Sequence, residues 1–138
     1  MGPGGKVPVP WFQVPVATRV FTDNLRARVL ALPDEPTLVD MAEIVADAHH
    51  GFQKIHPFRD TNGRTGRVLD LYFFWVTFGF KRSSLALSPV IEPFPTSADD
   101  DEYYEGLAEA DEHRPERLRR YYLARIAQLF VGMTFSVP

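Results

Sequence analysis

The chain has 138 residues, a formal net charge of −3, 45% hydrophobic and 24% charged residues, and no cysteine. These values fit a single domain over residues 1–138, and they exclude disulfides, thiolate catalysis and cysteine-based zinc sites. The nearly balanced charge predicts no general binding of nucleic acid. No apolar run is long enough to enter a membrane and no signal peptide is visible, so we expect a cytoplasmic protein, or one delivered without a readable signal.

The N-terminal part of the chain is rich in glycine and proline. We expect residues 1–6 to be disordered. Residues 7–16 mix prolines with valines, Trp11 and Phe12, which favours an extended edge strand or an ordered loop because proline donates no ladder hydrogen bond. The two aromatic side chains are expected either to staple this segment to the helices or to contact a partner. Thr22 or Asp23 can then cap a short helix that ends before Pro33.

The rest of the chain predicts helices. One helix begins at Thr37 and repeats apolar residues at helical spacing as far as Phe52, with His49 expected in the core. A second, from Arg64 to about Phe78, is apolar nearly all round except for a polar stripe of Arg64, Arg67 and Asp70, and so is expected at the centre of a bundle. Further helices are predicted over 99–110 and from Pro115 to about Phe130. The fold class is therefore mainly α, a small helical bundle around a central apolar helix, with its core at 37–130.

Residues 56–67, with the sequence HPFRDTNGRTGR, carry the chemistry. His56 is the side chain here that can take a proton near neutral pH. Asp60 offers hard oxygen to Mg²⁺, a cation often held between a carboxylate and substrate phosphates. Phe58 is expected to bury the loop against the bundle as a structural anchor. The segment predicts a reaction on a nucleotide phosphate.

The second half of this segment predicts an anion site. Asn62 and Gly63 lie where the chain turns into a helix, and unpaired backbone N–H groups at a helix start bind phosphate. Arg64 and Arg67 are three positions apart and can both reach polyphosphate oxygens, which a guanidinium binds well. Thr61 stands just before them; its branched side chain could crowd the anion or donate a hydrogen bond to it.

The segment resembles the active-site loop of Fic-domain (Fic/Doc-like) proteins, whose pattern is His-Pro-Phe-x-Asp/Glu-Gly-Asn-Gly-Arg-x-x-Arg. The similarity extends to AHHGFQKIHPF upstream and YYEGLAEADEHRPERLRRYYLARI downstream, and covers roughly 37–130. The resemblance implies a protein adenylyltransferase that moves AMP from ATP to a Ser, Thr or Tyr hydroxyl of a target protein, with Mg²⁺ as cofactor. It implies that His56 is the base and that Asp60 is the Mg²⁺ ligand. It also implies that Asn62 and Gly63 bind the α-phosphate and that Arg64 and Arg67 bind the β- and γ-phosphates. Thr61 replaces the usual glycine.

Two further expectations and two alternatives follow from the resemblance. Residues 7–16 are a candidate short β-hairpin flap that pairs with an extended target segment. Ser88 to Glu92 is the one stretch with the spacing of the family's inhibitory helix, but Pro89 argues against a helix, so a separate inhibitory protein is a candidate partner.

The alternatives to AMP transfer are a Fic-like scaffold used for a small-molecule reaction and a non-catalytic module that binds nucleotide or a partner. Dependence on ATP and Mg²⁺ distinguishes them.

Overall fold

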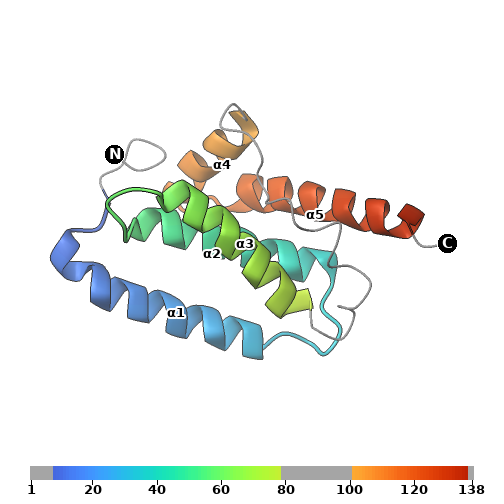
Figure 1. The fold of residues 1–138 in the computed structure, drawn as a ribbon, viewed down its shortest axis with the longest axis horizontal. Helices are drawn as coiled ribbons and strands as arrows, with labels where there is room; N and C mark the ends of the chain where they lie inside the picture. The colour runs from blue at the N-terminus through green and yellow to red at the C-terminus, as the bar shows by residue number, and fades with distance from the viewer. Residues whose placement is uncertain (1–7, 79–100, 137–138) are drawn as a thin grey trace.

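The protein is described by a computed structural model that covers residues 8–78 and 101–136. Within these ranges all regular structure is helical, which confirms the mainly α prediction (Figure 1). None of the described helices is long and apolar enough to cross a membrane. The elements are one 3-10 turn and five α-helices: η2 (Trp11–Gln13), α1 (Val14–Leu30), α2 (Leu38–Ile55), α3 (Asn62–Phe78), α4 (Asp101–Asp111) and α5 (Glu116–Ser136).

Helix α2 is the centre of the bundle, because it packs against α1, α3, α4 and α5. Its start is fixed by a capping box: the Thr37 hydroxyl accepts the Asp40 N–H at 3.1 Å, and the Asp40 carboxylate accepts the Thr37 N–H at 2.8 Å. The predicted bundle around an apolar helix is confirmed, but its centre is not the Arg64–Phe78 helix. That helix, α3, leaves Val68 and Tyr72 exposed.

The main core lies between α2, α4 and α5. Helices α4 and α5 approach closely at Gly106, where an added Cβ would lie 3.1 Å from the Leu118 Cα atom. Asp47 of α2 ties the outer helices together, since its carboxylate accepts hydrogen bonds from Arg28 of α1 and Arg119 of α5. The buried core residues are Met41, Ala42, Val45, Ala46, Tyr103, Leu107, Ala110, Leu118, Tyr121, Tyr122 and Ile126.

Helix α1 begins earlier than the sequence predicts. It starts at Val14 rather than near Thr22 or Asp23, and Pro15 lies in its first turn. Proline suits that position because its fixed φ is helical and its missing N–H would have no partner there. The predicted caps therefore lie inside the helix, where the Thr22 hydroxyl donates to the Arg19 carbonyl at 3.0 Å.

The extended flap predicted for residues 7–16 is wrong over the described positions 8–16, which contain the turn η2 and the start of α1. Trp11 and Phe12 are 85% and 62% exposed, and their rings meet edge to face with centroids 5.8 Å apart. They do not staple the segment to the bundle. The sequence pattern missed the start of the helix because proline is tolerated both in the first turn of a helix and in an edge strand. The prolines alone therefore do not distinguish the two structures.

The C-terminal helices agree with prediction to within a few residues at their starts. Helix α4 confirms the predicted helix over the described positions, from 101 onward, and ends at Asp111. Helix α5 starts directly after Pro115 but continues to Ser136 rather than ending near Phe130. The expectations for residues 1–6 and for Ser88 to Glu92 lie outside the described residues.

Candidate active site

The predicted loop lines a cavity of about 320 Å³. The cavity lies at the connection where α2 ends and α3 begins, and Figure 1 shows the course of that connection. The cavity brings together the predicted base, the predicted metal ligand and both predicted arginines. Its lining residues are His56, Arg59, Asp60, Thr61, Asn62, Gly63, Arg64 and Arg67. Phe58 is the one residue with a predicted role in the loop that does not line it.

His56 ends helix α2 in the left-handed conformation, with φ 52° and ψ 57°. Its backbone N–H still donates to the Phe52 carbonyl at 2.9 Å, so the residue caps the helix and turns the chain into the loop. The side-chain Nδ1 is buried and has no hydrogen-bond partner among the described residues. The residue itself lines the cavity, so its imidazole is available to a bound ligand there.

Asn62 closes the loop. Its buried side chain donates from Nδ2 to the Phe58 carbonyl at 2.7 Å and accepts the Phe58 N–H on Oδ1 at 3.0 Å. Both ends of the amide are thus engaged, which leaves the backbone N–H of Asn62, rather than its side chain, for an anion. Phe58 is held by its backbone, because its side chain is 51% exposed and only approaches Phe52, with centroids 6.4 Å apart. The expectation that its ring buries the loop is wrong.

Thr61 occupies the N-cap of α3 in a left-handed conformation, with φ 69°. Its carbonyl accepts the first helical hydrogen bond, from the Thr65 N–H at 2.9 Å, and its own N–H donates to the Asp60 Oδ1 atom at 2.7 Å. A branched residue in this region of φ is strained by about 1–2 kcal/mol. The glycine of the Fic pattern avoids that strain. The N–H groups that follow, in the first turn of α3, have no helical acceptor and open onto the cavity.

Arg64 and Arg67 supply positive charge on the same side of α3. Arg64 is exposed and Arg67 is half-buried, and a Cβ added at Gly63 would lie 3.5 Å from Arg67 Nη1. Within residues 8–78 and 101–136, neither guanidinium forms an ion pair with Asp60 or Asp70. Both arginines line the cavity, where their guanidinium groups can bind an anionic ligand.

Asp60 is exposed at the cavity and uses Oδ1 for the Thr61 N–H, so its other oxygen remains for a cation. The described part of the chain contains no group of three or more histidine and carboxylate side chains that could hold a metal alone. This donor set fits Mg²⁺ bound jointly by one carboxylate and the phosphate oxygens of a substrate.

Comparison with known proteins identifies the family. Residues 4–74 match the Fic/DOC family, which is more than half of the chain. The chain belongs to the Fic/DOC family. The matching region includes α1, α2, the loop and most of α3, so the cavity described above lies within the part of the chain that matches the family.

Two curated proteins are similar in sequence to this Fic domain. Protein adenylyltransferase fic-1 of Caenorhabditis elegans is 39% identical over 94 residues, which are 67% of this chain and 16% of the relative. A Fido domain-containing protein of Dictyostelium discoideum is 40% identical over 78 residues, which are 56% of this chain and 46% of the relative. The chain thus matches less than half the length of either relative. No solved structure matches it significantly.

Beneath the Fic loop lies a buried polar network that the sequence did not reveal. Asp70, predicted in a polar stripe with the arginines, is 0% exposed and accepts hydrogen bonds from His49 Nδ1 at 2.9 Å and the Tyr122 hydroxyl at 2.8 Å. The Tyr103 hydroxyl donates to His49 Nε2 at 2.5 Å, which confirms His49 as a paired core residue. Burial raises the pKa of Asp70, and the neighbouring His49 offsets part of that effect. The feature of the sequence that could have indicated this network is an aspartate within an otherwise apolar helix.

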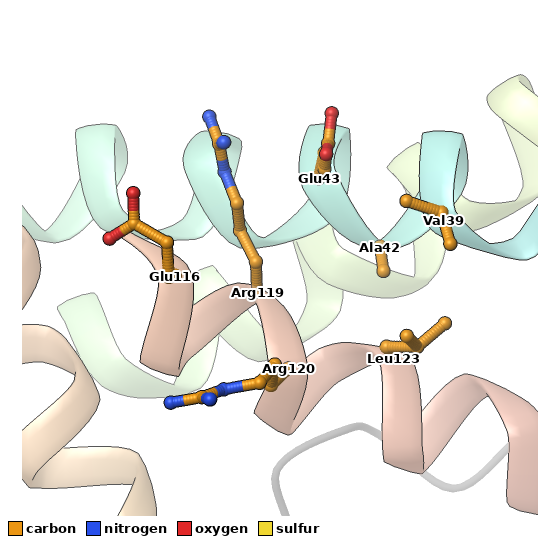
Figure 2. Close-up of a pocket in the computed structure, with 7 residues that line it drawn as sticks. All are labelled: Val39, Ala42, Glu43, Glu116, Arg119, Arg120 and Leu123. Atoms are coloured by element: carbon orange, nitrogen blue, oxygen red, sulfur yellow. The ribbon is translucent and has the colours of Figure 1, made fainter. Parts of the chain in front are cut away.

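A second cavity of the Fic domain, of about 380 Å³, lies between α2 and α5 (Figure 2). Its apolar walls come from Val39 and Ala42 on one side and Leu123 on the other, as Figure 2 shows. Arg119 at its edge is held by Asp47, with N–O distances of 3.0 and 2.6 Å. No residue of the loop 56–67 lines this cavity, so we assign the chemistry to the cavity at the α2–α3 connection.

Proposed function

We propose that this Fic domain transfers AMP from ATP to a Ser, Thr or Tyr hydroxyl of a target protein. The observation that carries the proposal is that one cavity is lined by His56, by Arg64 and Arg67, and by the first residues of α3. Membership of the Fic/DOC family and the similarity to the nematode relative, which is named a protein adenylyltransferase, support it. The target protein is the partner that this reaction requires.

The cavity offers a separate contact for each part of a triphosphate. The backbone N–H groups at Asn62 and Gly63, with the positive end of the α3 dipole, bind the α-phosphate. Arg64 and Arg67 bind the β- and γ-phosphates through their guanidinium groups. Asp60 and the phosphates together would hold Mg²⁺, which when bound neutralises phosphate charge. ATP is thereby oriented with its α-phosphorus near the end of α2.

Transfer is a single displacement at the α-phosphorus. The target hydroxyl gives its proton to His56 Nε2 as its oxygen forms a bond to the α-phosphorus. The bond from that phosphorus to the oxygen bridging the α- and β-phosphates breaks, and pyrophosphate leaves with the electron pair. The basic groups Arg64 and Arg67 stabilise the charge that develops on the leaving pyrophosphate. The products are the AMP-modified target and pyrophosphate, and His56 then releases the proton to solvent.

The proposal is tested with ATP labelled at the α-phosphate, with and without Mg²⁺, in the presence of cell extract. We expect label on a discrete protein band, and we expect His56→Ala to reduce the rate by about 10²–10⁴-fold. His50→Ala is the matched control, because His50 lies on the same helix but binds Asp111 outside the cavity.

Other results of this experiment lead to the alternative functions. A folded protein that transfers no label but is thermally stabilised by ATP would be a nucleotide-binding module. An activity that persists without ATP and Mg²⁺ would indicate a Fic scaffold used for a small-molecule reaction. An unchanged rate in His56→Ala would rule out His56 as the base.

A further inference from the structure

Helices α2 and α3 meet through two matching stripes of residues. His49 and Gln53 are four positions apart on α2, so they share one face of that helix, and His56 follows Gln53 by three positions as the C-cap. On α3, the facing stripe consists of Asn62, Gly66 and Asp70, which are four positions apart. The contacts between the stripes, here called the polar seam, are His49 to Asp70 at 2.9 Å, Gln53 to the Asn62 carbonyl at 3.2 Å, and Gly66 against Gln53.

Gln53 is the part of the polar seam nearest the cavity. Its side chain is 4% exposed and lies one turn before His56, and its Nε2 donates to the backbone carbonyl of Asn62. Asn62 in turn holds both backbone groups of Phe58. Gln53 therefore joins the last turn of α2 directly to the first residue of α3 and, through Asn62, to the closed loop.

Gly66 makes room for this contact. A Cβ added at Gly66 would stand 2.4 Å from Gln53 Nε2, far inside van der Waals distance, and 3.3 Å from His49 Cε1. Any larger residue at position 66 would displace the Gln53 amide from the Asn62 carbonyl. The two residues are therefore matched to each other, and the geometry of the loop depends on the pair.

We propose that Gln53 is a positioning residue that fixes the distance between the base His56 and the phosphate-binding start of α3. This inference rests on the proposed function. The hydrogen bond itself contributes little to stability, about 1 kcal/mol. Its effect on the reaction is larger, because an error of about 1 Å in the alignment of reacting groups can cost about 10²-fold in rate. Gln53 acts through Asn62 and does not touch the substrate.

Single-turnover transfer from α-labelled ATP tests this role in the purified chain. The acceptor is the unmodified form of the protein that the labelled band in the extract identifies. Gln53→Leu keeps the volume of the side chain but has no donor. We expect its rate constant at saturating ATP to fall about 10- to 100-fold, with the reaction amplitude and the ATP Kd changed less than threefold. A merely structural role would lower the amplitude, the fraction of folded protein, and leave the rate constant unchanged.

Gln53→Glu provides a second readout that does not depend on the first. At neutral pH its carboxylate would face the Asn62 carbonyl, whereas the protonated acid can donate to it as glutamine does. We expect the ratio of its rate constant to that of the wild type to rise as the pH is lowered. Taking the ratio at each pH removes the pH effects that are common to both proteins.

Gly66→Ala, Gln53→Ala and the double variant that combines these two changes complete the experiment. Gly66→Ala should slow transfer as Gln53→Leu does, and the double variant should be no slower than the slower single variant, because both changes break one contact. A wild type that transfers no label overturns the proposed function. A wild type that transfers while Gln53→Leu keeps its rate constant, and Gln53→Glu shows a pH-independent ratio, overturns the positioning role alone.

Discussion

Gly63 lies beside the guanidinium group of Arg67: a Cβ added at Gly63 would be 3.5 Å from Arg67 Nη1. That distance is an ordinary van der Waals contact, so an alanine fits without displacing the arginine. The same methyl group would cover the first-turn N–H groups of α3, which the α-phosphate has to approach closely. A substitution at position 63 is therefore expected to weaken ligand binding without lowering the stability of the fold.

Gly63→Ala is expected to leave the fold intact and to weaken ATP binding. Alanine in the first turn of a helix is favoured over glycine, so the free energy of unfolding should stay equal or rise by about 0.5–1 kcal/mol. The ATP Kd should rise at least tenfold. Urea unfolding and calorimetric titration with ATP measure the two quantities. Unchanged ATP affinity in a folded variant would show that phosphate does not approach this backbone.

Thr61→Gly is expected to stabilise the protein. It removes the strain of a branched residue at φ 69°, about 1–2 kcal/mol, and adds the entropy cost of glycine, about 0.5–1 kcal/mol, so the free energy of unfolding should rise by about 0.5–1 kcal/mol. His113→Gly is the matched control, since His113 has φ 63° outside the cavity. Both variants should gain stability, but only Thr61→Gly should change ATP affinity. A less stable Thr61→Gly would mean that the threonine side chain is required at this turn.

The buried tyrosines should make stability fall at alkaline pH. Burial raises the pKa of Tyr103 and Tyr122 above the ordinary value of 10.0, and the nearby Asp70 adds to the effect. Because the folded state holds these protons more tightly than the unfolded state, the stabilisation is complete below pH 10.0 and is lost as the pH rises through the folded pKa.

Urea unfolding of Tyr103→Phe across this range tests the linkage. The variant should be less stable than the wild type at neutral pH, because His49 loses a hydrogen bond, but its stability should fall less steeply above pH 10.0. Tyr104→Phe, which removes an exposed hydroxyl next to Tyr103, is the control and should follow the wild type. Equal slopes for Tyr103→Phe and the wild type would contradict the assignment.

Asp70→Ala is expected to destabilise the protein by about 3–5 kcal/mol, because it leaves the buried His49 N–H and the Tyr122 hydroxyl without their acceptor. Asp70→Asn keeps one acceptor oxygen and should cost less. Asp60→Asn is the control: Asp60 is exposed, and asparagine can still accept the Thr61 N–H, so its effect should be about 0.5 kcal/mol or less. Chemical unfolding of the three variants ranks them, and a small loss in Asp70→Ala would show that water replaces the carboxylate.

Local sequence signals predicted the parts of the structure that depend on neighbouring residues. The helix predicted to begin at Thr37 does so because its capping box needs only Asp40 three positions later. The loop residues from His56 to Arg67 meet at one cavity because they are contiguous and end in a helix start. Such features are set within a turn or two of the chain, so spacing and residue type suffice to predict them.

Features that depend on distant partners were missed. Asp70 is buried because His49 and Tyr122, which lie 21 and 52 positions away, supply its donors. Gln53 carries no signal of its own until Gly66 is placed against it. The apolar content of α3 did not reveal that α2, rather than α3, contacts all the other helices. In each case the missing information is a tertiary contact, which no local pattern encodes.

The left-handed conformation of His56 affects how an inactive form of this protein should be made. Alanine at position 56 would remove the base but keep a Cβ in a strained conformation, whereas glycine adopts φ 52° freely. His56→Gly should therefore be the sturdier inactive variant. Since it retains the loop, both arginines and Asp60, it is the form best suited to capturing ATP and target together before transfer.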